Sequence, residues 1–510
     1  MSSRRRVLQR LGAAVVPLLW PEHGQTQAGP VSVGITVDSR ERLRAVNPMI
    51  LGNNLDWTHN AQAMYVENTQ NMPKGFLELA DGLSPTALRF PGGTNADFYH
   101  WKDGIGPLNR RGKSKNLSGE AELHTLGTDD FLALCKRWGA EPLITVNIAT
   151  APPQEAADWV QYTNKRQSNL PKVRYWEIGN EPYLEEHAPE SKMSPAEYAR
   201  RANAFIKAMK AVDPSIKCGI TLRTDTLGGN QATPFKGFNE TVLGIVDQPY
   251  EFVALHSSYY PVTPKKLESE EEMYLATMAG TRVMEADAQA TREALRRRHG
   301  QNNIKLAFTE VNALYSVDIL RFGMAAVFLS KTDRFIESMA AALYTADALR
   351  SFSLMDDLLM ANYWSLSGNW WFGAISHDIK PRPQYHVLQA YRQLCRGELV
   401  SCKVNTPTFA TSKAGFVPAF ADTPQVAAHA VFNSGATHIA VINRHPERGA
   451  RLRLELPGVP RGKVLVRELG ADGRFDRDVR WSGTSAPIRE GIAEISMRQH
   501  AFSVLTVESA

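Results

Sequence analysis

The sequence predicts an α/β protein: a (β/α)8 TIM barrel followed by a C-terminal β-sandwich domain. Three observations support this fold class. The chain has 510 residues, enough for one large barrel and an appended domain. Short apolar runs alternate with helical patterns from about residue 49 to residue 365. From about residue 400 the helical periods stop, and short strand-like runs follow.

Composition and charge exclude several classes of protein. Hydrophobic residues make up 43% and charged residues 22%, which excludes a largely disordered chain. No run reaches about 18 apolar residues, so no membrane-spanning helix is expected. The net charge of +5 includes a net +3 from four Arg and one Glu in residues 1–28, which leaves +2. The basic cluster from Arg110 to Lys115 is expected to be a solvated loop, and no nucleic-acid partner is expected.

The first 28 residues have the layout of an export signal. A basic run from Arg4 to Arg10 precedes an apolar run from Leu11 to Trp20, and a polar stretch ends at Ala28. The segment from Ser3 to Leu8 also resembles a twin-arginine signal. We therefore expect residues 1–28 to be a twin-arginine-type signal peptide and the protein to be periplasmic or secreted.

The barrel strands are expected in apolar runs that lack polar alternation, as in strands buried on both faces. The runs are Met49–Leu55, Thr86–Phe90, Pro142–Ile148, Val173–Ile178, Ile216–Leu222, Phe252–His256, Ile304–Thr309 and Ala361–Leu366. Between them, helices are predicted at Thr128–Trp138, Pro195–Val212 and Glu270–Arg298. Strand–helix units in this number imply a closed parallel barrel. An open doubly wound sheet is the alternative, but no glycine-rich phosphate loop follows the first run.

Short runs bounded by turn residues predict the C-terminal β-sandwich. They are Val426–Phe432, Thr437–Ile442, Arg451–Leu456, Lys463–Leu469 and Phe502–Val507. An earlier strand at Val31–Val37 can join this sheet and so clasp the two domains together. We expect the barrel with its leading strand over residues 29–395 and the sandwich over residues 396–510.

The four cysteines exclude a scaffold built on disulfides. Cys135 and Cys218 fall in a helical and a strand pattern, so both are expected to be buried thiols. Cys395 and Cys402 could pair in an exported protein, although spacing alone does not decide between a bridge and two thiols.

Polar and aromatic residues follow most of the apolar runs, at the strand ends where a parallel barrel has its active site. They are Asn53, Asn54 and Asp56; Arg89 and Asn95; Asn147; Asn180 and Glu181; His256, Tyr259 and Tyr260; Glu310 and Asn312; and Trp364. The pattern has no Cys/His metal spacing and no Ser–His pairing at a strand-to-helix turn. We expect no metal and no organic cofactor.

Glu181 and Glu310 follow the fourth and seventh strands, which lie on opposite sides of the barrel mouth. Cleavage of a glycosidic bond needs two such carboxyl groups, one protonated to release the leaving oxygen and one ionised to attack the sugar carbon. Either glutamate alone could be a solvated surface residue. The pair at facing strand ends predicts a glycosidase with a carbohydrate substrate.

Four stretches carry a resemblance to a known family. They are LRFPGGTNADFYHWKDGIGP (88–107), GTDDFLALCKRWGAEPLITVNIAT (127–150), VRYWEIGNEPY (173–183) and FTEVNALY (308–315). They resemble the clan of retaining glycoside hydrolases with an Asn-Glu pair on strand 4 and a second Glu on strand 7. Within that clan the chain is most similar to glycoside hydrolase family 51, the α-L-arabinofuranosidases, over roughly residues 31–395.

The resemblance implies that Glu181 is the general acid/base and Glu310 the nucleophile of a double displacement. Asn180 would bind the sugar 2-hydroxyl, and Arg89 would orient Glu310. Tyr259 or Tyr260 would hydrogen-bond to Glu310, and Trp364 would form an apolar wall. From the residues themselves, Arg89 could instead form a structural ion pair and Trp364 could be ordinary packing. His256 could be a core histidine or a substrate contact.

Several positions depart from the family pattern. Asp56 stands where the family usually has a sugar-binding Glu, and Thr94 precedes Asn95 after the double glycine. Thr309 and Val311 flank Glu310 in place of an acid and a Trp. These departures keep the two catalytic glutamates that the resemblance implies but change residues that would recognise the sugar.

Two alternatives stay open. The first is an endo-glucanase, xylosidase or uronic-acid-specific glycosidase of the same clan. Aromatic residues could line a longer cleft for such substrates: Trp57, Tyr99, Trp101, Trp370 and Trp371. The second is a carbohydrate-binding barrel without catalytic activity.

Overall fold

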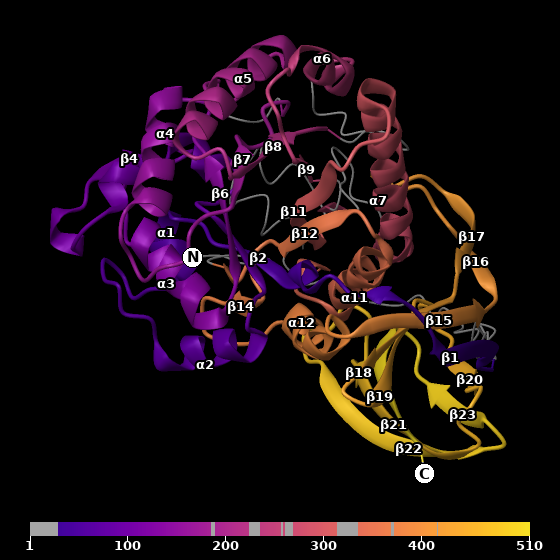
Figure 1. Ribbon diagram of the computed structural model, residues 1–510. Helices are drawn as coiled ribbons and strands as arrows, with labels where there is room; N and C mark the ends of the chain where they lie inside the picture. The colour runs from indigo at the N-terminus through magenta and orange to yellow at the C-terminus, as the bar shows by residue number, and fades with distance from the viewer. Residues whose placement is uncertain are drawn as a thin grey trace, which may run out of the picture.

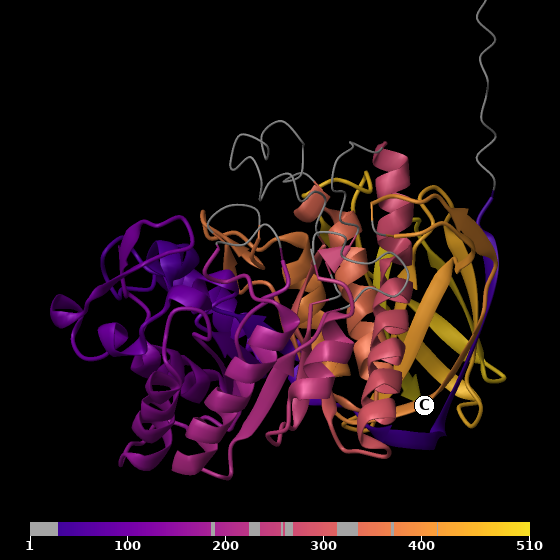
Figure 2. The ribbon, with the colours of Figure 1, turned by 90° about the horizontal axis from the view of Figure 1, so that it is seen from above.

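Two units make up the structure, a barrel of parallel strands ringed by helices and a β-domain packed beside it (Figure 1; Figure 2). The computed structural model describes residues 29–184, 189–223, 235–256, the backbone of 259–260, and residues 269–313, 335–368, 372–415 and 417–509. The expected signal peptide, residues 1–28, lies outside the described residues.

The barrel has the predicted strands, and each predicted run overlaps one of them. They are β2 (Gly52–Asn54), β3 (Ala87–Phe90), β6 (Glu141–Val146), β7 (Tyr175–Ile178), β8 (Lys217–Thr221), β9 (Phe252–Leu255), β11 (Lys305–Ala313) and β12 (Leu358–Tyr363). Of these, β6, β11 and β12 extend beyond their predicted bounds. Neighbouring strands pair in parallel, and β11 with β9 and β12 with β2 close the ring. A short strand β10 (Tyr259–Tyr260) lies beside the end of β11.

Helical segments surround this ring. They are α1 (Thr58–Ala63), α2 (Lys74–Leu83), α3 (Thr128–Trp138), α4 (Pro153–Val160), α5 (Pro195–Val212), α6 (Phe238–Ile245), α7 (Glu270–His299), α11 (Met339–Leu354) and α12 (Pro383–Leu394). Shorter turns are η1 (Pro48–Leu51), η2 (Thr94–Phe98), η3 (Trp101–Gly104), η4 (Leu108–Arg110) and η5 (Gln161–Lys165). The predicted bounds of α3 and α5 are confirmed, and α7 ends one residue later than predicted. Ser269 and Glu272 form a capping box that fixes where α7 begins.

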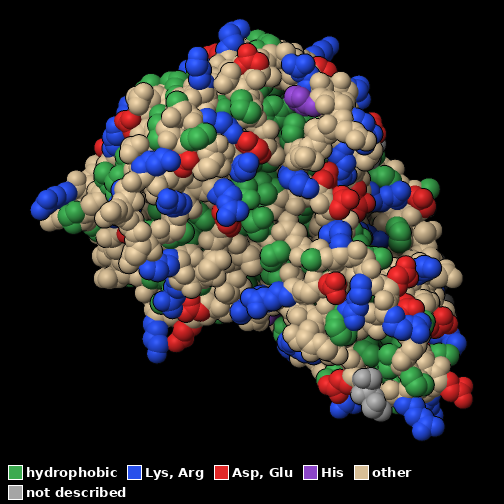
Figure 3. Space-filling view, in the orientation of Figure 1, with side chains coloured by type: hydrophobic (Ala, Val, Ile, Leu, Met, Phe, Trp, Pro, Cys, Tyr) green, Lys and Arg blue, Asp and Glu red, His purple; other side chains and the backbone are tan. Residues whose placement is uncertain are grey.

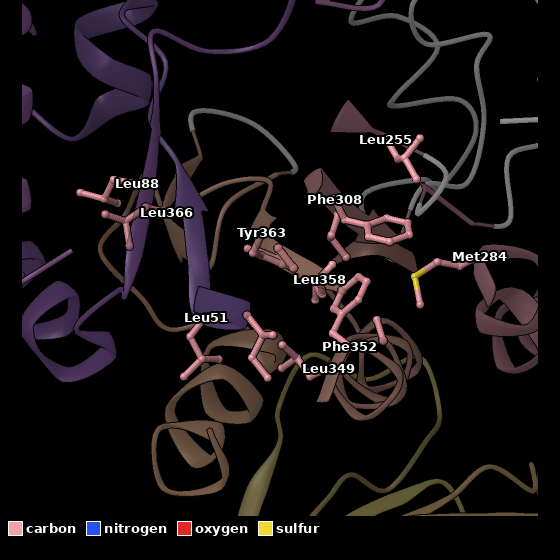
Figure 4. Packing of buried hydrophobic residues seen from close by; sticks show 14 of the residues in the cluster. Leu51, Leu88, Leu255, Met284, Phe308, Leu349, Phe352, Leu358, Tyr363 and Leu366 are labelled. Atoms are coloured by element: carbon pink, nitrogen blue, oxygen red, sulfur yellow. The ribbon is translucent and has the colours of Figure 1, made fainter. Parts of the chain in front are cut away.

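Apolar side chains fill the space between the strands and the helices. Figure 4 shows Phe308 of β11 facing Phe352 of α11, with Leu349 and Leu358 beside them. The ring centroids of Phe308 and Phe352 are 4.9 Å apart, and both side chains are buried. Burial of one such side chain contributes about 1.5–3 kcal/mol. This packing fixes β11, the strand that carries Glu310, against α11.

The C-terminal domain is built mainly from antiparallel strands, as the predicted β-sandwich requires. Its strands are β15 (Glu398–Asn405), β18 (Val426–Asn433), β19 (Ala436–Asn443), β20 (Ala450–Glu455), β21 (Arg461–Gly470), β22 (Arg480–Arg489), β23 (Ile492–Met497) and β24 (Ala501–Ser509). The leading strand β1 (Val31–Ala45) joins them, antiparallel to β15 and parallel to β20, so the hydrogen bonding runs around a closed ring. The expected clasp through Val31–Val37 is therefore present.

Three small two-stranded sheets complete the fold. They are β4 (Lys113–Lys115) with β5 (Ala121–Leu123), β13 (Ser367–Gly368) with β14 (Ile375–Ser376), and β16 (Thr408–Thr411) with β17 (Phe420–Pro424). The predicted border between residues 395 and 396 falls between α12 and β15.

All four cysteines are free thiols, so no bridge joins Cys395 to Cys402. Cys395 ends α12 and is buried in the large core shared by the barrel and the adjoining strands. Cys402 lies on β15 and packs against the separate core of the C-terminal domain. Cys135 and Cys218 are buried, as expected.

Charged side chains are mixed on the face shown in Figure 3, where Lys and Arg are interspersed with Asp and Glu. The expectation of a solvated basic loop is wrong for Arg111. Its side chain is 3% exposed and forms an ion pair with Asp130, 2.6 Å away, while Arg110, Lys113 and Lys115 are exposed. Within the described ranges, no helix is long and apolar enough to cross a membrane.

A buried charge cluster joins α11 to the C-terminal domain. Asp347 of α11 accepts hydrogen bonds from Arg350 (2.6 Å), from Thr281 of α7 (2.5 Å) and from Arg444 after β19 (2.9 Å). Burial alone would raise the pKa of Asp347, but the charges of Arg350 and Arg444 lower it to about 2. The cluster therefore contributes stability that depends on an ionised aspartate.

We expect Asp347→Asn to destabilise the protein by about 3–5 kcal/mol, because it leaves the buried Arg444 without its carboxylate. The melting temperature measures this loss. The pKa of Asp347 is below its unfolded value, so this stabilisation is present above about pH 4 and is lost as the pH falls toward 2.

Asp38→Asn is the matched control. The Asp38–Arg40 pair also lowers the pKa of its aspartate to about 2, but it lies at the surface. Water screens an exposed pair, so the melting temperature of this variant should stay close to that of the wild type. Equal losses in the two variants would contradict a special role for the buried cluster.

Candidate active site

The interior of the barrel changes from apolar to polar along its strands. Side chains two residues apart point to the same face of a strand. Ala87, Leu143 and Ala307 belong to a small apolar cluster inside the barrel, and two residues further on stand Arg89, Thr145 and Thr309, all buried. The polar layer thus lies toward the carboxyl ends of the strands, where barrel active sites are found.

Arg89 lies at the centre of this polar layer, with no exposed side-chain surface. Its Nε donates to Glu177 Oε2 (2.5 Å) and its Nη2 to Asn180 Oδ1 (2.8 Å). Its Nη1 donates to Glu310 Oε1 (2.9 Å) and to Asn54 Oδ1 (3.1 Å). The guanidinium therefore contacts the predicted nucleophile and the amide next to the predicted acid/base.

Glu177 is a buried member of the site that the sequence prediction missed. Besides the Arg89 bond, its Oε2 accepts from the Thr145 hydroxyl (2.6 Å) and its Oε1 from the Thr309 hydroxyl (2.7 Å). Burial alone would raise the pKa of Glu177, but the charges of Arg89 and His256 lower it to about 2. Glu177 could have been identified in the sequence as an acidic residue within the otherwise apolar strand β7.

His256 brings the two predicted catalytic glutamates together. Its Nδ1 lies 2.9 Å from Glu181 Oε1 and 3.9 Å from Glu310 Oε1. Its Nε2 is hydrogen-bonded to the Thr309 hydroxyl at 2.8 Å. Burial alone would lower the pKa of His256, but the charges of Glu310 and Glu181 raise it to about 10. At neutral pH the imidazole is therefore a cation among carboxyl groups.

A sharp turn after β7 presents Glu181 to the site. Gly179 and Glu181 both have positive φ, +79° and +40°, and the Glu181 carbonyl accepts from Leu184 N. A non-glycine residue rarely adopts a positive φ, so the backbone of Glu181 is held there by its surroundings. The Glu181 side chain is 14% exposed and that of Glu310 is 7% exposed.

Asp56 is held rigidly beside the double glycine that follows β3. Its Oδ2 accepts from Asn95 Nδ2 (3.0 Å), and its Oδ1 accepts from the backbone N and the hydroxyl of Thr58. Burial raises the pKa of Asp56. A Cβ on Gly92 would lie 2.7 Å from Asp56 Cγ, so a glycine is needed for this close approach.

Trp364 follows β12 and borders Glu310. A Cβ on Gly93 would lie 2.8 Å from Glu310 Oε1 and 3.3 Å from the indole ring of Trp364, which is half-buried. Tyr259 and Tyr260 form β10 next to Asn312 and Ala313 of β11, and their side chains lie outside the described residues. The structure thus brings Asp56, Asn95 and Trp364 to the rim around the Arg89 network.

The expectation that Trp57, Tyr99 and Trp101 line an open cleft is wrong. All three are buried, with 4% exposure or less. Trp57 packs on Tyr99, and Tyr99 and Trp101 each pack on Trp159, so the three rings form core rather than a binding surface. Trp370 and Trp371 lie outside the described residues. No group of three or more His, Cys, Asp or Glu side chains is arranged to hold a metal ion in the part of the chain that the structure describes.

Parts of the chain are similar in sequence to known proteins. Residues 79–234 match the model of the "Alpha-L-arabinofuranosidase 1 domain". α-L-Arabinofuranosidase C of Emericella nidulans is 31% identical over 212 residues, which are 36% of this chain and 41% of that protein. The chain therefore spans less than half the length of this curated relative. The intracellular exo-α-(1→5)-L-arabinofuranosidase of Streptomyces lividans is 24% identical over 87% of this chain and 69% of that protein.

Solved structures share the whole architecture. α-L-Arabinofuranosidase of Thermotoga maritima, in complex with arabinose, matches with a TM-score of 0.78 and 23% identity over 94% of this chain and all of that one. The family 51 enzyme of Thermotoga petrophila matches over the same shares with a TM-score of 0.76 and 22% identity. The predicted TIM barrel with a C-terminal β-domain is confirmed. In sequence over residues 79–234, and in fold throughout, the chain is similar to the family 51 α-L-arabinofuranosidases.

Proposed function

We propose that this protein is a retaining glycoside hydrolase that cleaves α-L-arabinofuranosyl linkages in polysaccharides or oligosaccharides. Glu181 serves as general acid/base and Glu310 as nucleophile. The observation that carries the proposal is the placement of both carboxyl groups on one imidazole nitrogen of His256, at 2.9 and 3.9 Å. Two facing carboxyl groups at the mouth of a barrel are the machinery of glycosidic cleavage.

The spacing favours retention of configuration. The nearest oxygens of Glu181 and Glu310 cannot be further apart than the two distances to His256 Nδ1 combined. That limit includes the separation of about 5–5.5 Å found in retaining enzymes and excludes most of the range of about 6.5–9.5 Å found in inverting ones. The attack is therefore assigned to a carboxylate and not to a water held between the two groups.

The hydrogen bonds support the roles proposed for the two glutamates. Arg89 donates to Glu310, which keeps that carboxylate an acceptor aimed at the sugar carbon. Glu181 is the more exposed of the two, which suits protonation of a leaving group and later activation of water. Two cations, Arg89 and His256, face three carboxyl groups, so the charges balance when one carboxyl carries the proton that acid catalysis needs.

The remaining site residues supply sugar contacts in this proposal. Asn180 Oδ1 is occupied by Arg89, whereas its buried Nδ2 has no hydrogen-bond partner among the described residues. This amide is placed to donate to the sugar 2-hydroxyl. Asp56 and Asn95 bind further hydroxyls, and Trp364 forms an apolar wall beside Glu310. His256 and one of Tyr259 and Tyr260 orient the carboxyl groups.

Among the residues that the structure describes, no observation favours the alternative activities. The buried positions of Trp57, Tyr99 and Trp101 remove the described aromatic residues that supported a longer cleft for an endo-acting enzyme. A binding barrel without catalysis has no need for two carboxyl groups on one imidazole. We further propose that the protein is exported, on the order of basic, apolar and polar segments in residues 1–28. The related Streptomyces enzyme is described as intracellular.

We expect Glu181→Ala to lower kcat about 10²–10⁴-fold on arabinofuranosides with poor leaving groups, because these need a general acid. Aryl arabinofuranosides with activated leaving groups should lose less, and azide should restore part of the rate with an azide product. Steady-state kinetics on both substrate types measures the difference. An equal loss on both would remove the acid/base assignment.

We expect Glu310→Gln to abolish turnover, by more than about 10³-fold, because an amide does not form the glycosyl-enzyme. Circular dichroism should show an unchanged fold. A panel of aryl furanosides and pyranosides tested with the wild type identifies the sugar. Wild-type rates in the variant would contradict the nucleophile assignment, and a preference for pyranosides would contradict the substrate.

We expect Arg4→Lys with Arg5→Lys to keep the precursor in the cytoplasm, because the twin-arginine pathway reads that pair. Cell fractionation with an activity assay measures the distribution. Unchanged export would contradict the twin-arginine assignment, and a wild type found only in the cytoplasm would contradict export.

A further inference from the structure

We propose that Glu177 is a positioning residue that couples the two catalytic glutamates, holding Arg89 against Glu310 with one oxygen and setting the proton arrangement of His256 beside Glu181 with the other. The inference rests on the proposed function for the roles of Glu181 and Glu310. Glu177 itself has no exposed side-chain surface and contacts neither of those carboxyl groups in the hydrogen bonds described above.

The first half of the coupling runs through Arg89. Glu177 Oε2 accepts from Arg89 Nε, on the edge of the guanidinium opposite to the one that meets Glu310 and Asn54. A planar guanidinium bound at Nε, Nη1 and Nη2 has no freedom to rotate. The position of Glu310 Oε1 is thereby tied to a carboxylate on β7, across the barrel from β11.

The second half runs through Thr309. The Thr309 hydroxyl has one proton, and it donates this proton to Glu177 Oε1 at 2.7 Å because a carboxylate oxygen only accepts. The hydroxyl oxygen lies 2.8 Å from His256 Nε2 and must therefore accept from it. Nε2 keeps its proton whether or not the imidazole is charged. The nitrogen that can lose a proton is Nδ1, which faces Glu181.

This arrangement gives the acid/base a fixed proton partner. Glu181 and His256 Nδ1 can exchange a proton with each other. The proton on His256 Nε2 takes no part in this exchange, because it is donated to Thr309. A hydrogen bond at one ring nitrogen of a histidine determines which nitrogen keeps its proton when the imidazole becomes neutral. Here the Glu177 carboxylate hydrogen-bonds to the imidazole through the Thr309 hydroxyl, and its Oε1 also lies 3.9 Å from His256 Nε2. The same carboxylate holds Arg89, the cation that contacts the nucleophile.

The cost of the arrangement points to a role beyond packing. Taking an ionised carboxylate fully out of water costs several kcal/mol, and an apolar side chain of similar volume at such a position is often as stable or more so. The charged groups that face Glu177 and His256 are Arg89 on β3, Glu181 after β7 and Glu310 on β11. The phenols of Tyr183 and Tyr198 also lie within the field of Glu177.

Glu177→Gln tests the charge with little change in shape. An amide has one acceptor oxygen, so it can accept from Arg89 or from Thr309 but not from both, and its NH2 group would donate where the carboxylate accepted. We expect kcat to fall about 10²-fold or more, with KM changed less than about 3-fold, because the carboxyl groups are displaced while the sugar contacts remain. Wild-type kcat in this variant would overturn the proposal.

Thr309→Val and Thr145→Val form a matched pair that serves if Glu177→Gln does not fold. Both hydroxyls are buried and donate to Glu177, one to each oxygen, but only Thr309 continues to His256. We expect Thr309→Val to lose about 10-fold more activity on poor than on activated leaving groups. Thr145→Val should keep the leaving-group dependence of the wild type. The same dependence in both variants would show a merely structural role.

A spectroscopic measurement separates this inference from the proposed function. The ¹⁵N signals of His256, identified by their absence in His256→Gln, report which ring nitrogen carries the proton as the pH rises through its titration. We expect Nε2 to stay protonated in the wild type and in Thr145→Val, and a mixture of tautomers in Thr309→Val. This result holds for whichever sugar the enzyme cleaves, whereas loss of the Nε2 proton in the wild type would overturn the coupling.

Discussion

The buried ion pair between Arg89 and Glu177 is the interaction on which the rest of the site depends. A guanidinium with no exposed surface is stable only if its hydrogen-bond donors find acceptors, and here the acceptors come from β2, β7, the turn after β7 and β11. One cation therefore ties together strands from different parts of the ring. The placement of Glu310 next to Asn180 follows from that constraint.

The side chains inside the barrel form an apolar layer and a charged layer at different heights along its axis. The interior layer away from the carboxyl ends of the strands is apolar, and the layer toward those ends holds the charged network. Packing of the apolar layer offsets the free-energy cost of burying the charged groups. The glycines after β3 have a corresponding role. Side chains on Gly92 or Gly93 would strike Asp56 or Glu310, so the backbone itself forms one wall of the site.

The C-terminal domain supports the barrel rather than standing apart from it. The described part of the chain starts in this domain with β1, continues into the barrel, and returns through β15 to pair with β1. Backbone carbonyls of Arg474 and Asp476 accept from the first N–H groups of α11, which would otherwise lack partners. Together with the buried Asp347 cluster, these contacts fix α11, which packs on the strand that carries Glu310.

Local patterns in the sequence determined the strands, α3, α5 and the start of α7, because apolar periodicity and capping act between near neighbours. They also pointed to Glu181 and Glu310, since the ends of parallel strands converge. Only the tertiary structure decided the partners of Glu177, because Arg89 and Thr309 lie 88 and 132 residues away. The burial of Trp57, Tyr99 and Trp101 was also visible only in the tertiary structure. The same is true of the placement of Cys395 and Cys402 in separate cores. Side-chain neighbours across a closed ring are set by packing, which no local pattern contains.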